Sequence, residues 1–148
     1  MGEITDLIAD KTGTITENKL RVSRVWLNKD MTFNHAPSHR IDPAAAFHKA
    51  VWPLLEMSIA CNVPKNRGPT DQGLVEFIEK CGSNIEETKR HYGVYNEDEV
   101  TCFEFSSRRK RRSTIIKVES AGDRLLCKGA SELILSECSH IIDAEGNR

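Results

Sequence analysis

The spacing of hydrophobic residues divides the chain into a strand-like start, a helical middle and a strand-rich end. The apolar run at residues 7–9 predicts a short buried strand. Imperfect alternation over residues 20–28 predicts a bulged or loosely paired strand, and residues 31–33 predict a short return strand. Residues 34–43 contain two prolines and two histidines and have the composition of a loop.

A helical pattern begins after this loop. Asp42 and Pro43 suit the cap and the first turn of a helix over residues 44–61, in which Pro53 should produce a kink or a break. Apolar side chains recur near one face of this helix, so we expect it to pack into the core.

Two further helices are expected in the middle of the chain. Thr70 or Asp71 should cap the first of them, which should end at Gly82. Ser83 should cap the next, with Glu86 completing a capping box, and this helix should run to about residue 93.

The last third of the chain has strand composition with tight connections. Residues 100–105, 113–118 and 124–128 should form an antiparallel meander. A short helix over residues 130–138 and a closing strand at residues 140–143 should follow. These elements predict an α+β fold, in which helices flank an antiparallel β-sheet.

The composition fits one ordinary globular domain of 148 residues. Hydrophobic residues make up 39% of the chain and charged residues 29%, which argues against disorder. The net charge of −1 provides no global field for nucleic acid or anionic membranes. No stretch is apolar for long enough to span a bilayer, and no signal peptide opens the chain. The five cysteines form no Cys-x-x-Cys pair and no convincing zinc site with the histidines, which favours free thiols in a reducing, cytosolic compartment.

The first candidate for chemistry is the sequence from Asp10 to Thr14, Asp-Lys-Thr-Gly-Thr, which follows the first apolar run. A carboxylate at the end of a buried strand, in a turn lined by two hydroxyl groups, could attack a phosphoryl group if a cation and a metal offset the charge. The alternative is a polar turn in which Asp10 only accepts backbone hydrogen bonds.

A second candidate is Phe105 with the basic run from Arg108 to Arg112. An aromatic ring beside cations suits a purine base and its phosphates, through stacking and charge pairing. A solvated basic turn, or a patch that resembles a nuclear-localisation signal, is the alternative interpretation.

Two strand and helix ends give weaker indications. Lys128 and Gly129 stand where a strand passes into a helix, so the lysine could bind an anion or pack along an adenine face. An ordinary tight turn explains them equally well. Thr70 and Asp71 stand at a helix start, where capping alone accounts for both residue types.

Taken together, these segments resemble the motifs of P-type ATPases, the family of ion and lipid pumps that pass through an aspartyl-phosphate. Residues 10–18 are similar to the phosphorylation signature of the family, which usually has leucine in place of Ile15. Residues 68–71, 105–110 and 127–132 are similar to its nucleotide-domain motifs and occur in the same order. The resemblance covers nearly the whole chain.

The resemblance implies a catalytic set at the start of the chain. Asp10 would be phosphorylated by ATP, Lys11 would help to neutralise the γ-phosphate, and Thr14 would contact the phosphate. Asp10 and the backbone carbonyl of Thr12 would hold Mg²⁺, together with ligands outside this chain.

The resemblance also implies an ATP-binding set further along. Phe105 would stack on adenine, and Lys110 and Lys128 would line the adenine and phosphate pocket. The full implied set is Thr70, Asp71, Phe105, Lys110, Lys128 and Gly129. Asp71 stands where the family commonly has glutamate, and Arg112 stands where methionine or another apolar residue is usual.

The organisation implied by the resemblance is that of a cytosolic part of an integral membrane pump. Residues 1–18 would supply the first strand and phosphorylation loop of the phosphorylation domain, and residues 19–148 most of a nucleotide-binding domain truncated at its C-terminal end. Its partners would be ATP and the remaining phosphorylation, actuator and transmembrane parts, with no nucleic acid. Such a piece should bind ATP weakly without hydrolysing it alone.

The resemblance favours a cation pump, calcium first, with a phospholipid flippase as the alternative within the family. A different class of protein also remains open, a non-catalytic module that binds polyanions or a partner through the basic run. A small phosphatase-like hydrolase with an aspartyl nucleophile would need further catalytic carboxylates downstream, and the sequence offers no plausible place for them.

Overall fold

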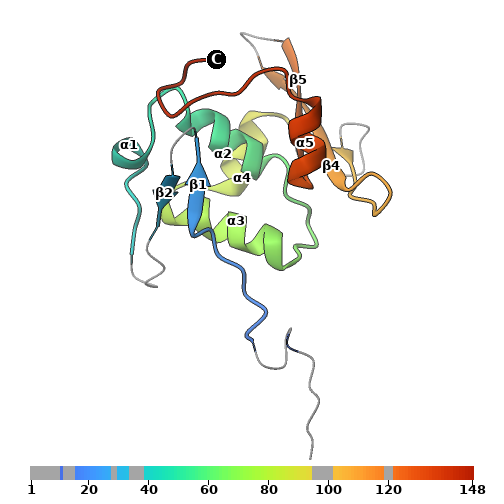
Figure 1. The fold of residues 1–148 in the computed structure, drawn as a ribbon, viewed down its shortest axis with the longest axis horizontal. Helices are drawn as coiled ribbons and strands as arrows, with labels where there is room; N and C mark the ends of the chain where they lie inside the picture. Colours follow the sequence, from blue (N-terminus) through green and yellow to red (C-terminus); the bar gives the residue numbers. More distant parts are fainter. Residues whose placement is uncertain (1–10, 12–15, 28–29, 34–38, 95–101, 119–121) are drawn as a thin grey trace, which may run out of the picture.

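The computed structural model of the chain describes residues 11, 16–27, 30–33, 39–94, 102–118 and 122–148 (Figure 1). The helices are α1 (Pro43–Ala46), α2 (Trp52–Ala60), α3 (Pro69–Lys80), α4 (Ile85–His91) and α5 (Ser131–Glu137). The strands are β1 (Arg24–Trp26), β2 (Asp30–Thr32), β3 (Cys102–Phe103), β4 (Arg111–Val118) and β5 (Gly122–Gly129). Helices α2, α3 and α4 lie between the β1–β2 ribbon and the sheet of β3, β4 and β5 (Figure 1). The predicted α+β fold is therefore confirmed.

The helix predicted over residues 44–61 is divided into α1 and α2. Asp42 caps α1 as predicted, since its carboxylate accepts a hydrogen bond from the backbone N–H of Ala44 at 3.0 Å. The break lies before Pro53, which occupies the first turn of α2. A proline is tolerated there because the N–H that it lacks would have no partner within the helix.

Helix α3 begins two or three residues earlier than predicted. Gly68 is its cap residue and Pro69 its first residue, so Thr70 and Asp71 lie in the first turn and the prediction that either is the cap was wrong. The predicted stop is confirmed at Gly82, whose φ of +87° is the left-handed conformation that ends many helices.

Two other local predictions were wrong, in each case because a side chain accepts hydrogen bonds from nearby backbone N–H groups. Asn84, not Ser83, caps α4, because its side chain accepts bonds from two backbone N–H groups of the first turn at 3.0 and 3.2 Å. Residues 140–143 form no strand. The Asp143 carboxylate instead accepts two later backbone N–H groups at 3.0 and 2.8 Å and turns the chain.

The predicted antiparallel meander is confirmed, with strand order β3-β4-β5. Strand β4 begins at Arg111, so the last part of the basic run belongs to the sheet and not to the turn. Its register with β5 places Arg112 opposite Lys128. Among the described residues, the strands predicted at residues 100–105 and 20–28 are shorter than expected, since β3 ends at Phe103 and β1 begins at Arg24.

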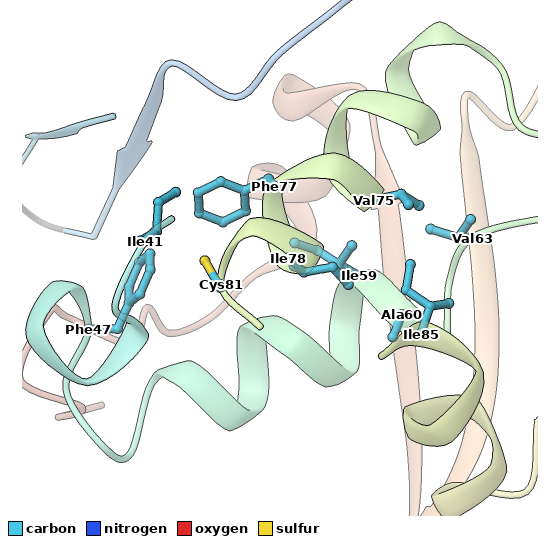
Figure 2. Packing of buried hydrophobic residues seen from close by; sticks show 10 residues of the cluster. All are labelled: Ile41, Phe47, Ile59, Ala60, Val63, Val75, Phe77, Ile78, Cys81 and Ile85. Atoms are coloured by element: carbon cyan, nitrogen blue, oxygen red, sulfur yellow. The ribbon is translucent and has the colours of Figure 1, made fainter. Parts of the chain in front are cut away.

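The larger hydrophobic cluster lies among the helices and the β1–β2 ribbon. Figure 2 shows its buried members, Ile41, Phe47, Ile59, Ala60, Val63, Val75, Phe77, Ile78, Cys81 and Ile85. Phe77 of α3 packs edge-on against Phe33 beside β2, with ring centroids 5.1 Å apart. This cluster fixes the position of α3, the helix whose first turn carries Thr70 and Asp71.

A buried asparagine connects the helices to the sheet. Asn62 follows α2 and is 1% exposed. Its amide nitrogen donates to the carbonyl oxygens of Leu126, at 3.3 Å, and Arg112, at 3.5 Å. Its amide oxygen accepts from the hydroxyl of Thr114 at 3.1 Å. One side chain thus holds both β4 and β5 against the end of α2.

The segment that follows the first motif passes over α3. A Cβ atom added at Gly73 would lie 2.4 Å from the carbonyl oxygen of Leu20, a separation that no real side chain allows. Glycine at this position therefore lets the backbone at Leu20 and Arg21 lie directly on the helix.

The cysteine thiols are all free. Burial raises the pKa of Cys61 to about 12 and that of Cys81 to about 11, so both are protonated at neutral pH. No helix in the described part of the chain is both long and apolar enough to cross a membrane.

We predict that Asn62→Ala lowers the free energy of unfolding by about 3 kcal/mol, because it leaves buried backbone and hydroxyl groups without their partner. Urea unfolding followed by circular dichroism measures this change. Asn66→Ala, at an exposed position nearby, is the control and should change stability by less than about 0.5 kcal/mol. A similar, small effect of both variants would contradict the connecting role of Asn62.

Candidate functional site

A cleft of about 730 Å³ opens between the start of α3 and one end of the three-stranded sheet. Its walls come from the loop before α3, the first turns of α3, the turn between β3 and β4, and the end of β5. The residues that line it are Pro64, Gly68, Pro69, Thr70, Asp71, Leu74, Glu104, Phe105, Ser107, Lys110, Arg112, Lys128, Gly129 and Ala130. Its size is within the range of pockets that hold small ligands.

The structure brings all six residues of the implied ATP-binding set to this cleft. They come from three separate segments, with Thr70 and Asp71 on α3, Phe105 and Lys110 around the β3–β4 turn, and the remaining two at the end of β5. Sequence motifs up to 59 positions apart therefore line one cavity.

Lys128 and Asp71 form an ion pair across the cleft. Both side chains are largely buried, and burial lowers the pKa of Lys128, an effect that hydrogen bonding and charge attraction from Asp71 oppose. Asp71 lies in the first turn of α3, where the helix dipole also favours a negative charge. The pair joins α3 to β5 and places an ammonium group on the cleft wall.

Arg112 and Glu104 form a second ion pair at the cleft. Arg112 is 2% exposed, whereas most of the Glu104 side chain is exposed. The β4–β5 register places Arg112 directly opposite Lys128, so the two cationic side chains project from the same face of the sheet, the face toward α3. Each cation thus has a carboxylate partner of its own.

Close backbone packing explains the glycine at position 129. A Cβ there would lie 2.3 Å from the carbonyl oxygen of Lys110 and 2.7 Å from the Cβ of Arg111. That carbonyl also accepts a hydrogen bond from the backbone N–H of Ala130 at 3.0 Å. Lys110 has a φ of +50°, which is unusual for a residue other than glycine. Gly129 therefore permits the close approach that fixes the Lys110 turn at the cleft.

Phe105 presents an exposed ring to the cleft, with 60% of the residue accessible. A large exposed aromatic side chain is a surface on which a planar ring can stack. Phe103, two residues earlier, is engaged elsewhere, since the guanidinium of Arg109 lies 5.7 Å from its ring centroid.

The basic run is not one solvated patch. Arg109 donates to the carbonyl oxygen of Glu104 at 3.2 Å and to the hydroxyl of Ser113 at 3.3 Å. Arg111 forms an ion pair with Glu137 of α5, and Arg112 lies in the cleft. Most of these cations therefore make specific contacts within the domain.

The implied catalytic set is only partly within the described residues. Asp10, Thr12 and Thr14 lie outside them. Lys11 is exposed, and its carbonyl oxygen accepts a hydrogen bond from the backbone N–H of Thr16 at 3.3 Å. The described residues contain no group of three or more His, Cys, Asp or Glu side chains that could hold a metal ion.

Glu104 lines the cleft but was not among the residues expected from the sequence, and Arg112 was included only as the last cation of the basic run and as a departure from a family pattern. The pairing of β4 with β5 is what identifies Arg112, because it places this residue directly opposite Lys128 on the same face of the sheet. Leu74 and Pro64 could not be identified as cleft residues from the sequence, since apolar residues at such positions suit any helix or loop.

Comparisons with known proteins agree with the motifs. Residues 57–148 match the family described as P-type ATPase, cytoplasmic domain N. Similar proteins include calcium-transporting ATPase PAT1 of Dictyostelium discoideum, 33% identical over 99% of this chain and 13% of its own length. The plasma membrane calcium-transporting ATPase mca-1 of Caenorhabditis elegans is 27% identical over 99% of this chain and 13% of its own length.

A third relative is calcium-transporting ATPase 10, plasma membrane-type, of Oryza sativa subsp. japonica, which is 30% identical over 99% of this chain. The chain spans only 13–15% of the length of these three relatives. The family match nevertheless covers more than half of the chain and includes all the residues that line the cleft. The chain therefore belongs to the P-type ATPase family, and residues 57–148 are those of its cytoplasmic domain N.

Proposed function

We propose that the cleft is an ATP-binding site and that the chain is the nucleotide-binding part of a P-type ATPase. The observation that carries this proposal is the convergence of the six residues implied by the sequence motifs on one cavity of about 730 Å³. The cavity combines an exposed aromatic ring, cationic side chains and a wall of small residues, which are the groups that a base and a polyphosphate require.

Each side chain then has a distinct role. Phe105 stacks on the adenine ring, and Lys128, held by Asp71, contributes a positive charge deep in the cleft. Lys110 is exposed on the cleft wall, so its ammonium group can reach the phosphates. Thr70 lies at the edge of the cleft with Asp71, and Gly129 keeps the Lys110 turn in place.

The chemical step belongs to the motif at the start of the chain. A carboxylate oxygen of Asp10 attacks the γ-phosphorus of ATP, the bond to the β-phosphate oxygen breaks, and ADP leaves with the electron pair. Lys11 and Thr14 stabilise the charge on the transferred group. Asp10 and the carbonyl of Thr12 offer the oxygen ligands that Mg²⁺ prefers, and Mg²⁺ would neutralise charge on the phosphates when bound.

This division of roles requires two parts of a larger protein. Residues 1–18 belong to the phosphorylation domain and residues 19–148 to the nucleotide-binding domain, on the cytosolic side of a membrane pump. The remaining phosphorylation, actuator and transmembrane parts are the partners. Closure of one domain on the other brings the γ-phosphate to Asp10.

Calcium is the proposed transported ion. The relatives described above are named as calcium-transporting ATPases, which favours a calcium pump over a phospholipid flippase. The alternative of a polyanion-binding module is disfavoured by the basic run, in which Arg109, Arg111 and Arg112 are held by contacts within the domain.

We predict that ATP binding depends on the Phe105 ring. Titration of ATP into the isotopically labelled chain should shift the NMR signals of residues around the cleft, and Phe105→Ala should weaken binding about tenfold, because base–aromatic stacking is lost. Phe103→Ala is the matched control and should leave the affinity unchanged, since this ring faces the Arg109 guanidinium and does not line the cleft.

A titration in which tripolyphosphate reproduces the ATP shifts, with changes confined to Arg108 and its neighbours, would contradict the base site. An equal loss of ATP affinity in Phe105→Ala and Phe103→Ala would also contradict the base site.

We predict that Asp10→Asn in the whole protein abolishes acid-stable phosphoenzyme, because an amide cannot act as the nucleophile. Transfer of radiolabel from the γ-phosphate of ATP measures this step. Asp30→Asn, at an exposed position in β2, should retain labelling. Persistence of label in Asp10→Asn would show that another residue accepts the phosphate.

A further inference from the structure

Phe105 combines an anchored backbone with an open side chain. The residue is 60% exposed and lies beyond the end of β3, so burial and strand pairing do little to fix its ring. A stacking surface binds best when it already has its bound orientation, because no rotational freedom is then lost on binding. The contacts of the residues beside Phe105 therefore determine how well this ring can receive a base.

The side chain of Glu104 is held from the face of the sheet that points toward α3. Its carboxylate forms an ion pair with Arg112, which is 2% exposed. Pairing of β4 with β5 fixes Arg112 opposite Lys128, and its backbone carbonyl accepts from the Asn62 amide at 3.5 Å. Arg112 is thus a fixed anchor, and the mostly exposed side chain of Glu104 is what it holds.

The backbone of Glu104 is held from the opposite face. Arg109 donates to the carbonyl oxygen of Glu104 at 3.2 Å and to the hydroxyl of Ser113 at 3.3 Å. Ser113 follows Arg112 in β4, so its side chain points to the other side of the sheet. The bonded carbonyl belongs to the planar peptide group that joins Glu104 to Phe105, so this bond fixes the start of Phe105.

The residue after Phe105 is fixed as well. The hydroxyl of Ser106 accepts from the backbone N–H of Arg109 at 3.2 Å, and its carbonyl oxygen accepts from that of Lys110 at 2.7 Å. These bonds close the turn of the basic run directly after Phe105. The ring is therefore open to the cleft while the backbone is held on both sides of it.

We propose that Glu104 is a positioning residue for ATP, which is held by Arg112 and Arg109 and keeps the Phe105 ring in the orientation that receives adenine. This proposal rests on the proposed function, since it assumes that the base stacks on Phe105. Arg112 acts through Glu104 and needs no contact with the nucleotide, which agrees with its burial.

A purely electrostatic role of Glu104 is the alternative, and it predicts the opposite result. A carboxylate beside a site for a polyphosphate repels the ligand, so its removal would strengthen the binding of ATP. If Glu104 positions the Phe105 ring, its removal weakens the stacking of the base and therefore weakens the binding of ATP.

The test is an NMR titration of ATP into the labelled 148-residue chain. Glu104→Ala should weaken ATP binding about fivefold, because the ring must then be ordered when the base binds. The loss should be smaller than that in Phe105→Ala, since the ring itself remains and Arg109 still holds the carbonyl of residue 104. Tripolyphosphate, which has no base to stack, should bind Glu104→Ala no more weakly than it binds the wild-type chain.

The matched control is Glu137→Ala. Glu137 forms an ion pair with Arg111 of the same basic run, and its side chain is 62% exposed, as is that of Glu104. It does not line the cleft, so its removal should leave the affinity for ATP unchanged.

A double-mutant cycle shows whether Glu104 acts through the ring. Glu104→Ala should have no further effect on ATP affinity in a chain that already carries Phe105→Ala, because no ring is left to position. A general loss of structure would lower the affinity in both backgrounds.

The outcomes distinguish this proposal from the one on which it rests. If the wild-type chain does not bind ATP, or if Phe105→Ala leaves the affinity unchanged, the base site itself is refuted. If Phe105→Ala weakens binding but Glu104→Ala does not, or if Glu104→Ala costs the same affinity with and without the Phe105 ring, the positioning role is refuted and the nucleotide site stands.

Discussion

The cleft depends on one buried side chain that makes no contact with its cavity. Asn62 satisfies carbonyl groups of both β4 and β5 and accepts from Thr114, so it fixes the sheet relative to α2. Because α2 also packs against α3, the asparagine sets the distance between the two walls of the cleft. A hydrophobic contact could supply comparable burial, but hydrogen bonds with defined directions give a fixed register between helix and sheet.

Two ion pairs then shape the cleft itself. Lys128 with Asp71 joins the sheet to α3, and Arg112 with Glu104 joins β4 to the segment after β3. Adjacent cations on paired strands would repel each other, so a carboxylate for each makes the arrangement tolerable. The result is a partly buried, cationic surface beside an exposed aromatic ring, which suits a nucleotide better than it suits an extended polyanion.

The sequence predicted the elements and the cleft residues with different success. The α+β class, the meander and the C-terminal end of α3 follow from periodicity and from Gly82, and three short motifs identified six residues that line one cavity. The cap of α4 and the course of residues 140–143 could not be predicted, because each depends on competition between neighbouring hydrogen-bonding side chains. The burial of Arg112 could not be predicted, because it follows from the pairing of β4 with β5 and not from its local sequence.

The most direct test of the account is a crystal structure of the chain with a non-hydrolysable ATP analogue. We expect electron density for the base against the Phe105 ring, between the start of α3 and the end of β5, with the phosphates near Lys110. Density for the analogue only outside the cleft, or none in crystals soaked well above the solution dissociation constant, would contradict it.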